Sequence, residues 1–380
     1  MRFALMTAQY QPASVTCGVG DYTRCLRRAF EELGHQCLVV TSSRTRSLEK
    51  DVYAVPGRWG LSETLSARRL LISNNPDAVI LQYTPEHYGY GMVFKLLPML
   101  IRLACSGPLV LTTFHTLVGG RWLSKANAVF MAAGSHGVIS IHPELTCLLR
   151  RRLPWWSGKL REIPIGANIP APTMRREEAY KGLRESLGLS ADTPVLGTFG
   201  FPAPGKGFET LIQALGLLNG SARVHLVCVG ETRTEDRMYK AALEGMASRT
   251  GVQPFIHWLG DLPEQEAANV LSGTDAYVVP YDEGASLRRG TLMAGFRAGV
   301  PVITTTPRYE DPSLRHRQTI LAVPPESPQA LADCIGSLLV DATLQEHLRQ
   351  EAAKEAVRFE WRTIAAQHVE FLHHLKAQKG

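Results

Sequence analysis

Short apolar runs alternate with longer helical segments along the first part of the chain. The strand-like runs are RFALMTA, QCLVVTS, DAVILQY, PLVLTTF and GVISIH. They are rich in β-branched and other apolar residues and do not alternate with polar ones, which is typical of strands buried on both faces of a parallel sheet. Helical segments such as DYTRCLRRAFEELG (21–34) lie between them. This order predicts a doubly wound α/β domain.

The pattern restarts after a polar, proline-containing segment at 168–193. The second set of runs is PVLGTFG, VHLVCVG, FIHWLG, DAYVVP and PVITT. We therefore predict two Rossmann-like domains over residues 1–170 and 171–360, with parallel sheets facing across a cleft. A last helix over 361–380 is expected to pack back toward the first domain. Because open α/β sheets bind ligands at the carboxyl ends of their strands, functional residues should follow strands.

Length and composition agree with two soluble globular domains. The 380 residues exceed the size at which one core normally keeps growing, and 45% of them are hydrophobic against 20% charged. The net charge of +6 suggests an anionic ligand or an acidic membrane surface, and it is too small to imply nucleic acid.

The seven cysteines are an odd number, form no CxxC pair and lie mostly in apolar runs, which indicates reduced core thiols in a cytoplasmic protein. The N-terminus, MRFALMTAQYQP, is typical of a first strand rather than a signal peptide. Charged residues and prolines interrupt the longest apolar region, residues 91–114, so it is not a clean membrane span.

Two segments after strands of the first domain carry candidate chemistry. Gly18 and Gly20 open a helix, where backbone amides can approach a phosphate. The third glycine of the dinucleotide fingerprint is missing, and a flexible turn with Asp21 as helix cap explains the glycines equally well. His115 ends another strand and can hydrogen-bond a sugar hydroxyl or transfer a proton. The alternative is a buried histidine with its hydrogen bonds satisfied.

The second domain has a similar loop at GFPAPGKG (200–207). Lys206 lies at the head of a helix in a loop of glycine and proline, so positive charge, free amides and the helix dipole come together as in a phosphate clamp. The loop is not a Walker A motif, because Gly207 stands where Ser or Thr is required. A solvated surface lysine is the alternative.

The loop YDEGASLRRG (281–290) precedes another helix. The residues at this helix N-terminus are Ser286, Arg288, Arg289, Gly290 and Thr291. Cations at this end oppose the helix dipole, which makes sense if an anion binds there, and the arginine fork suits a phosphate. The alternative is pairing of the arginines with Asp282, Glu283 or Glu310.

The sequence contains no metal-binding motif and no nucleophile elbow of a serine hydrolase. The basic run at 148–161 includes Trp155 and Trp156, and tryptophan favours the membrane interface. Peripheral contact with anionic lipid at the inner membrane face and ordinary packing of the tryptophans in the core explain this run equally well.

These features together resemble glycosyltransferase family 4, which has the GT-B fold. The resemblance spans nearly the whole chain, and its segments occur in the family's order. They are GVGDYTRCLRRAFEELGHQCLVV, TTFHT, REIPIGANI, GKGFETLIQAL, GTDAYVVPY and AGVPVITT.

The resemblance implies retaining transfer of a sugar from a nucleotide diphosphate donor, with neither a metal ion nor another cofactor. It implies that Lys206 contacts the donor phosphates and that Gly18 and Gly20 line the diphosphate. Gly200, in the loop before Lys206, is a further candidate for donor binding. The resemblance further implies that His115 contacts the sugar. Gly230 and Glu231 of the VGET segment are expected near the base. Fixed cations and amides would stabilise the leaving diphosphate electrostatically.

The acceptor is expected at the first domain, where QYTPEHYGYG (82–91) follows a strand and carries Glu86 and His87. Ordinary loop packing explains this segment equally well. The sequence identifies neither the base and sugar of the donor nor the acceptor, which can be a glycan, a lipid-linked sugar or a small molecule.

The chain departs from the family pattern in two places. Phe201 stands where an arginine is usual, and Ser286 and Ala294 replace two glutamates. We expect Arg288 or Arg289, or both, to replace the lost arginine. Ser286 and the amides of Gly290 and Thr291 would hold the sugar or a phosphate. Two alternatives stay open. One is a nucleotide-sugar epimerase or hydrolase of the same fold, and the other, suggested by the missing glutamates, is a catalytically silent nucleotide-binding protein.

Overall fold

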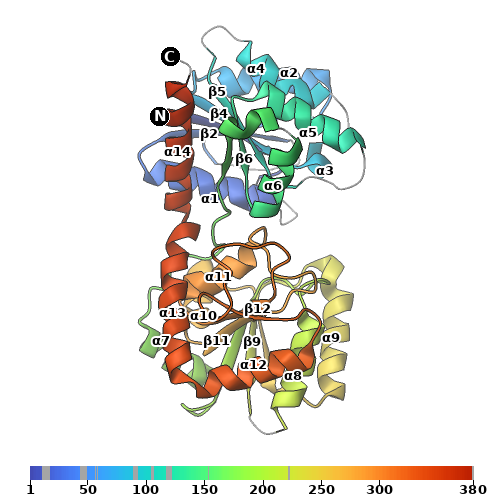
Figure 1. Ribbon diagram of the computed structural model, residues 1–380, viewed down its shortest axis with the longest axis vertical. Coiled ribbons are helices and arrows are strands. Elements are labelled where there is room, and N and C mark those ends of the chain that lie inside the picture. Colours follow the sequence, from blue (N-terminus) through green and yellow to red (C-terminus); the bar gives the residue numbers. More distant parts are fainter. Residues whose placement is uncertain are drawn as a thin grey trace. The chain divides into compact units, whose positions relative to one another are not determined.

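The computed structural model forms two compact units (Figure 1). The described residues are 1–10, 18–42, 49–55, 57, 59–88, 93–103, 107–116, 122–152, 154–220 and 223–378. Unit 1 comprises Met1–Ile165 and Glu360–Gly380, and unit 2 comprises Gly166–Phe359. The first boundary lies slightly before the expected residue 170, and the last helix belongs to unit 1.

Unit 1 is built on a seven-stranded parallel sheet with the order β3-β2-β1-β4-β5-β6-β7. Its strands are β1 (Arg2–Met6), β2 (Gln36–Ser42), β3 (Val52–Val55), β4 (Ala78–Tyr83), β5 (Leu109–Phe114), β6 (Gly137–Ser140) and β7 (Leu160–Glu162). The strands β4 and β5 are buried along their whole length, as their unbroken apolar runs predict.

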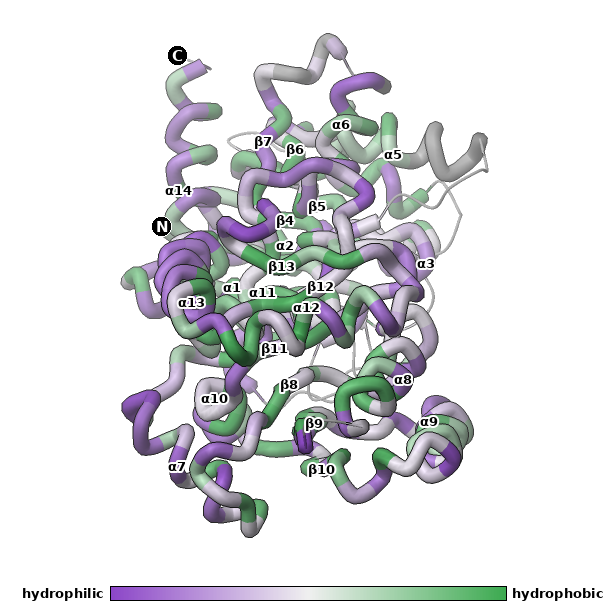
Figure 2. The backbone as a smooth tube through the Cα atoms, turned by 60° about the horizontal axis from the view of Figure 1, so that its bottom comes forward, coloured by the Kyte–Doolittle hydropathy of each residue, from purple (hydrophilic) through white to green (hydrophobic). Residues whose placement is uncertain are grey.

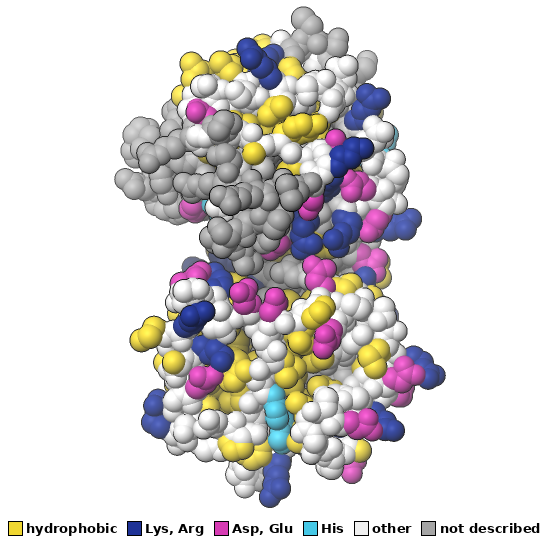
Figure 3. Space-filling view, turned by 180° about the vertical axis from the view of Figure 1, so that it is seen from behind, with side chains coloured by type: hydrophobic (Ala, Val, Ile, Leu, Met, Phe, Trp, Pro, Cys, Tyr) yellow, Lys and Arg dark blue, Asp and Glu magenta, His cyan; other side chains and the backbone are white. Residues whose placement is uncertain are grey.

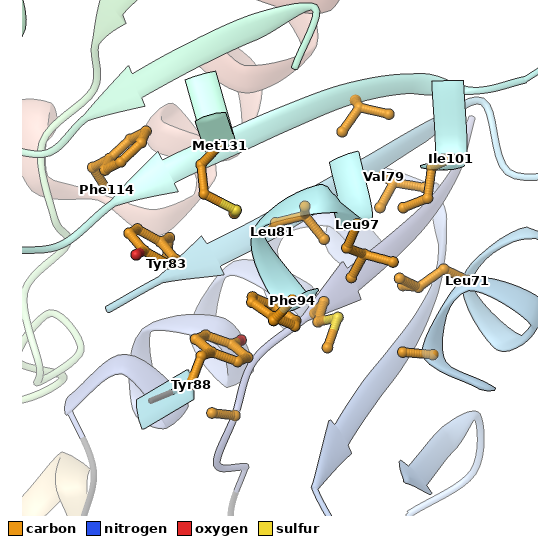
Figure 4. Close-up of a cluster of buried hydrophobic side chains, with 14 of the residues drawn as sticks. Leu71, Val79, Leu81, Tyr83, Tyr88, Phe94, Leu97, Ile101, Phe114 and Met131 are labelled. Carbon is orange, nitrogen blue, oxygen red and sulfur yellow. The ribbon is translucent and has the colours of Figure 1, made fainter. Parts of the chain in front are cut away.

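Helices cover both faces of this sheet. They are α1 (Gly18–Glu32), α2 (Leu61–Ile72), α3 (Pro85–Tyr88), η1 (Val93–Leu96), α4 (Leu97–Arg102), α5 (Trp122–Gly134), α6 (Pro143–Arg152), η2 (Pro154–Lys159) and α14 (Trp361–Ala377). Successive residues of β4 point to opposite faces: Leu81 joins a cluster with Leu97 of α4 and Met131 of α5 (Figure 4), whereas Ile80 joins Phe30 of α1 on the other face.

The last helix, α14, packs closely on unit 1. It lies against α1, and its Leu375 and Phe371 approach Gly137 of β6. A Cβ atom at Gly137 would lie 2.6 Å from Leu375 Cδ1 and 2.9 Å from Phe371 Cζ. Only glycine permits this contact between helix and strand.

Unit 2 has a six-stranded parallel sheet with the order β10-β9-β8-β11-β12-β13. Its strands are β8 (Val195–Phe199), β9 (His225–Val229), β10 (Ile256–Gly260), β11 (Ala276–Val279), β12 (Val302–Thr305) and β13 (Leu321–Val323). Apolar residues predominate in β11 and β13, whereas α13 is largely polar (Figure 2).

The helical elements of unit 2 are α7 (Arg176–Ser186), α8 (Phe208–Leu218), η3 (Thr234–Asp236), α9 (Arg237–Arg249), η4 (Gln253–Phe255), α10 (Glu264–Ser272), α11 (Gly290–Ala298), α12 (Pro328–Val340), α13 (Ala342–Ala356) and η5 (Val357–Phe359). Leu211 of α8 and Ile335 of α12 share one core cluster with Val278 of β11. Gly295 of α11 contacts Tyr277, so α11 covers the opposite face.

Charged side chains of both signs occur on the face of unit 2 that Figure 3 shows, where Lys and Arg side chains are scattered among acidic ones. No helix in the described ranges is both long and apolar enough to cross a membrane. No disulfide joins the five cysteines that the structure describes, but Cys147 is exposed, so the expectation of core thiols is wrong for this residue.

Candidate functional site

The predicted donor residues of unit 2 meet at the carboxyl edge of its sheet, the edge at which the strands end. Gly200 follows β8, Gly230 follows β9, and Thr291 lies in the first turn of α11. A Cβ atom on Gly200 would lie 2.7 Å from Thr291 Cγ2 and 3.2 Å from Lys206 Nζ, and one on Gly230 would lie 2.7 Å from the carbonyl carbon of Gly200. The loops after β8 and β9 and the helix α11 therefore form one site.

Lys206 is held inside this site rather than solvated. Its Nζ donates a hydrogen bond of 2.6 Å to the carbonyl oxygen of Phe201 and lies 3.4 Å from the centroid of the Phe201 ring. Burial is the main cause that lowers the pKa of Lys206 to about 7, together with the positive charges of Arg233 and Arg289 and against a smaller opposite effect of Asp236.

Gly207 explains how Lys206 reaches this position. The residue has a φ of 73° and directly precedes helix α8. A Cβ atom there would lie 1.8 Å from the carbonyl oxygen of Pro280, at the end of β11. The glycine that rules out a Walker A motif is thus required for the close approach of two loops.

The two arginines of the second loop differ in their surroundings. Arg289 lies over the ring of Tyr281, 4.6 Å from its centroid, and its Nη1 donates to the carbonyl oxygen of Gly205 at 3.4 Å. Arg288 forms an ion pair of 2.6 Å with Glu283, in which the side chains are 41% and 63% exposed. Arg289 approaches the same carboxylate at 3.4 Å. Of the three carboxylates weighed as partners, Glu283 is therefore the one that pairs, and Arg289 is the arginine next to Lys206.

The start of α11 is tightly packed. A Cβ atom on Gly290 would overlap Asn168, whose Oδ1 would lie 2.4 Å away. The Thr291 hydroxyl hydrogen-bonds with the hydroxyl of Tyr281 at 2.6 Å, and the Ser286 hydroxyl accepts from the backbone N–H of Arg288 at 3.4 Å. Both hydroxyls have protein partners, and Ala294 is buried in the helix.

Arg233, which the sequence motifs did not single out, belongs to the same site. Its guanidinium carbon lies 3.7 Å from the centroid of the Phe201 ring, and its Nε forms an ion pair of 2.5 Å with the buried carboxylate of Asp236. The signal was available, because Arg233 follows β9 directly after the VGET segment. Glu231 is exposed in this loop.

In unit 1, His115 lies at the carboxyl end of β5 and is 7% exposed. Its Nε2 hydrogen-bonds with Oε1 of Gln82 at 2.8 Å, and the ring packs edge-on against Tyr22 with the centroids 4.8 Å apart. Burial lowers the pKa of His115 to about 3, with smaller effects of His87 and His142. The imidazole is therefore neutral at physiological pH.

Gln82 and Thr113 form a polar pair beside His115 that sequence analysis also missed. They are register partners on β4 and β5, and both are buried. Among the residues that the structure describes, Gln82 Nε2 and Thr113 Oγ1 have no hydrogen-bond partner. An unsatisfied buried polar group costs about 1–3 kcal/mol, so such groups at the carboxyl edge of a sheet indicate a ligand.

The other predicted residues of unit 1 lie at the same edge. Gly18 and Gly20 are in the first turn of α1, but residues 11–17 of the loop before them lie outside the described residues. A carboxylate oxygen of Glu86 accepts a hydrogen bond of 3.3 Å from the hydroxyl of Thr116, next to His115. Burial lowers the pKa of His87, an effect that Glu86 partly opposes. Residues 89–91 of the predicted acceptor loop are likewise not described.

The basic run at 148–161 forms the end of α6 and the turn η2. Trp156 is half-buried against the core of unit 1, and Lys159 lies over its ring at 5.2 Å from the centroid. The side chain of Trp155 lies outside the described residues. Packing in the core accounts for Trp156, and the membrane contact stays a prediction.

A separate hollow of about 710 Å³ lies at the amino edge of the unit 1 sheet, where Arg2, His35 and Asn75 line it. This is the edge opposite His115. In the described part of the chain, no group of three or more His, Cys, Asp or Glu side chains is arranged to hold a metal ion.

Comparisons with known proteins show which proteins have a similar fold and a similar sequence. Over 98% of this chain and 99% of the other, the structure superimposes on Anabaena Alr3699/HepE in complex with UDP and glucose, with a TM-score of 0.74 and 17% identity. Sucrose-phosphate synthase from Thermosynechococcus elongatus gives a TM-score of 0.73 at 20% identity, over 99% of each chain. The chain has the GT-B fold, as predicted.

Residues 193–341 match the family described as Glycosyl transferases group 1. The D-inositol 3-phosphate glycosyltransferase of Corynebacterium urealyticum is 28% identical over 219 residues, which cover 56% of this chain and 50% of the relative. The chain thus spans about half the length of the curated relatives it matches first. These matches agree with the resemblance to glycosyltransferases that the sequence motifs predict.

Proposed function

We propose that the protein is a glycosyltransferase that moves a sugar from a nucleoside diphosphate sugar to a hydroxyl acceptor, with retention and without a metal ion. The observation that carries this proposal is the contact of Lys206 with Phe201 and Gly200 at the carboxyl edge of the unit 2 sheet, with Arg289 close enough to lower the pKa of Lys206. Open α/β sheets bind their ligands at this edge.

The cations suit the chemistry of the leaving group. When the bond between sugar and diphosphate breaks, negative charge develops on the diphosphate, and fixed positive charges stabilise it without reorganisation. The mutual repulsion of Lys206 and Arg289 is relieved when an anion binds between them. Lys206 then provides a point charge and Arg289 a planar fork, which are two common ways to bind phosphate.

Unit 1 offers groups for the sugar and the acceptor hydroxyl. His115 is neutral, so its ring can donate at one nitrogen and accept at the other. The unsatisfied amide of Gln82 and hydroxyl of Thr113 are further partners for sugar hydroxyls. We assign the acceptor to the side of Glu86 and His87. The UDP and glucose named for Alr3699/HepE and the inositol phosphate named for the relative support a polyhydroxyl substrate.

The absence of the usual glutamates favours one alternative, a catalytically silent protein that binds nucleotide. Ser286 and Ala294 stand at these two positions, and neither side chain contains a carboxylate. An epimerase or hydrolase of the same fold would instead consume the donor without an acceptor.

A binding screen followed by mass spectrometry tests these functions. Thermal unfolding with UDP, GDP, ADP and their glucose and mannose conjugates identifies the base, because a ligand of the native state raises the melting temperature. The best donor is then incubated alone and with a panel of sugars, inositol phosphates and lipid-linked acceptors. A glycosylated product supports the proposal. Conversion of the donor alone identifies the epimerase or hydrolase, and binding without any turnover identifies the silent protein.

A further inference from the structure

Phe201 carries one cation on each face of its ring. Lys206 Nζ lies 3.4 Å and the guanidinium carbon of Arg233 3.7 Å from the ring centroid. Two groups this close to the centre of one face would overlap, so each occupies its own face. The ring therefore keeps two positive charges apart while its π-electrons attract both.

Each cation is anchored by a second contact. Lys206 donates to the carbonyl oxygen of Phe201, and Arg233 uses Nε for its ion pair with Asp236. Within the described residues, the terminal nitrogens of Arg233 donate no hydrogen bond. The Arg233 side chain is 27% exposed, so these nitrogens remain accessible.

The edge of the Phe201 ring completes a site for an anion. An aromatic ring is negative on its faces and positive at its edge. An anion at this edge meets the positive rim of the ring and lies between the two cations. A group with two linked phosphates matches two separated positive charges better than a single phosphate does.

We propose that Arg233 is a phosphate-binding residue for the nucleoside diphosphate and that Phe201 is a positioning residue that spaces Arg233 from Lys206. This rests on the proposed function, in which the donor is a nucleoside diphosphate sugar. It revises the expectation that Arg288 and Arg289 alone replace an arginine at position 201, because Arg233 from the loop after β9 lies on the Phe201 ring itself.

Calorimetric binding of UDP, GDP, ADP and the matching nucleosides to the full chain tests the proposal. Arg233→Gln should weaken diphosphate binding about 10- to 100-fold, the loss expected for a charge-assisted hydrogen bond. Binding of the nucleoside should change less than about twofold, because the nucleoside lacks the phosphates that Arg233 binds in this proposal. Arg237→Gln is the matched control, since Arg237 is exposed four residues further on, and it should bind like the unaltered protein.

A second pair of variants tests the spacing role of the ring. Phe201→Leu keeps an apolar side chain but removes the π-faces. It should lower the affinity for the diphosphate several-fold without changing the affinity for the nucleoside. Adding Phe201→Arg to Arg233→Gln should recover part of the lost affinity, because a cation returns to the same site. Melting temperatures without ligand show that each variant is folded.

Three outcomes would overturn the proposal. Equal diphosphate affinity of Arg233→Gln and the unaltered protein overturns it and leaves the proposed function standing. Parallel loss of nucleoside and diphosphate binding assigns Arg233 a structural role. If the unaltered protein binds none of the three diphosphates, the proposed function fails as well.

Discussion

At the scale of single residues, Arg288 and Arg289 are neighbours with different surroundings. Arg288 pairs with Glu283 where both side chains are exposed, and such pairs contribute only about 0–1 kcal/mol. Arg289 is the less exposed of the two and contacts Tyr281 and Gly205 beside Lys206. The two arginines, which the sequence could not distinguish, therefore have separable roles.

Substitution of each arginine with glutamine should distinguish the roles of Arg288 and Arg289. Arg289→Gln should lower the affinity for the nucleoside diphosphate identified in the screen by about 10- to 100-fold, because a charged partner of the phosphates is lost. Arg288→Gln should change this affinity less than about threefold. Calorimetry on the two variants is the measurement. An equal loss for both would show that the loop rearranges and that Arg288 also reaches the phosphates.

Lys206 should make nucleotide binding depend on pH. Its pKa is about 7 in the free protein, through burial and the nearby Arg233 and Arg289, whereas Asp236 acts in the opposite direction. A bound diphosphate favours the charged ammonium and raises this pKa. Below pH 7 Lys206 is already protonated and contributes no pH dependence. Above pH 7 the protein must take up a proton to bind, so affinity falls with rising pH, by at most tenfold per unit.

Calorimetry at pH 8 in buffers of different ionisation enthalpy measures this proton uptake directly. The unaltered protein should take up a fraction of a proton that approaches one. Lys206→Arg keeps a permanent charge and should remove the uptake. Uptake that persists in Lys206→Arg would assign the proton to another group, and no uptake in the unaltered protein would show that Lys206 is already charged.

At the scale of elements, a buried ion pair ties α7 to the sheet of unit 2. Arg184 is 1% exposed and pairs with Asp275 at 2.6 Å. It also donates to the carbonyl oxygens of Thr193 and Gly273, and Asp275 accepts from the backbone N–H of Val195. Burial raises the pKa of Asp275, while Arg184 acts against this shift.

Removal of Arg184 should therefore destabilise unit 2 strongly. Arg184→Met leaves a buried carboxylate without its partner, which costs about 3–5 kcal/mol. Arg175→Met is the control, because its ion pair with Glu178 is exposed and contributes about 0–1 kcal/mol. Urea unfolding, followed with and without the bound nucleotide, gives the change in the free energy of unfolding for both variants. A similar small loss for both variants would contradict the role of the buried pair.

The elements that the sequence predicted and those that it missed differ in their place in the sheets. Unbroken apolar runs found central strands such as β4, β5 and β11, because both faces of these strands are buried. The missed strands β3, β7 and β13 all lie at sheet edges and are short or partly exposed. An edge strand has one neighbour and less burial, so its sequence carries a weaker pattern.

In the candidate site too, the sequence pattern reveals some residues and leaves others undetected. Lys206 and His115 were found because a single loop or strand end carries their signal. Arg233 and Gln82 gain their importance from partners in other elements, Phe201 and His115. Local patterns do not encode which side chains meet across parallel strands, so the contacts of Arg233 with Phe201 and of Gln82 with His115 appeared only in the structure.

At the scale of the whole molecule, the proposed function divides substrate recognition between the two units. The cations near Phe201 belong to unit 2, whereas His115, Gln82 and Thr113 belong to unit 1. The phosphates and the sugar of one donor should therefore affect different parts of the chain. Hydrogen exchange of the full chain can resolve them, because a ligand slows the local opening of the segments that it contacts.

A nucleoside diphosphate alone should slow exchange in residues 200–207, 230–236 and 281–291. The corresponding diphosphate sugar should slow exchange further in residues 112–116, because the sugar hydroxyls bind His115 and its neighbours. In His115→Ala this additional protection should disappear while the protection of unit 2 remains. If the sugar leaves exchange in unit 1 unchanged, His115 does not contact the donor sugar, and the polar groups at that edge serve the acceptor alone. Protection confined to unit 1 would instead contradict the donor site assigned to unit 2.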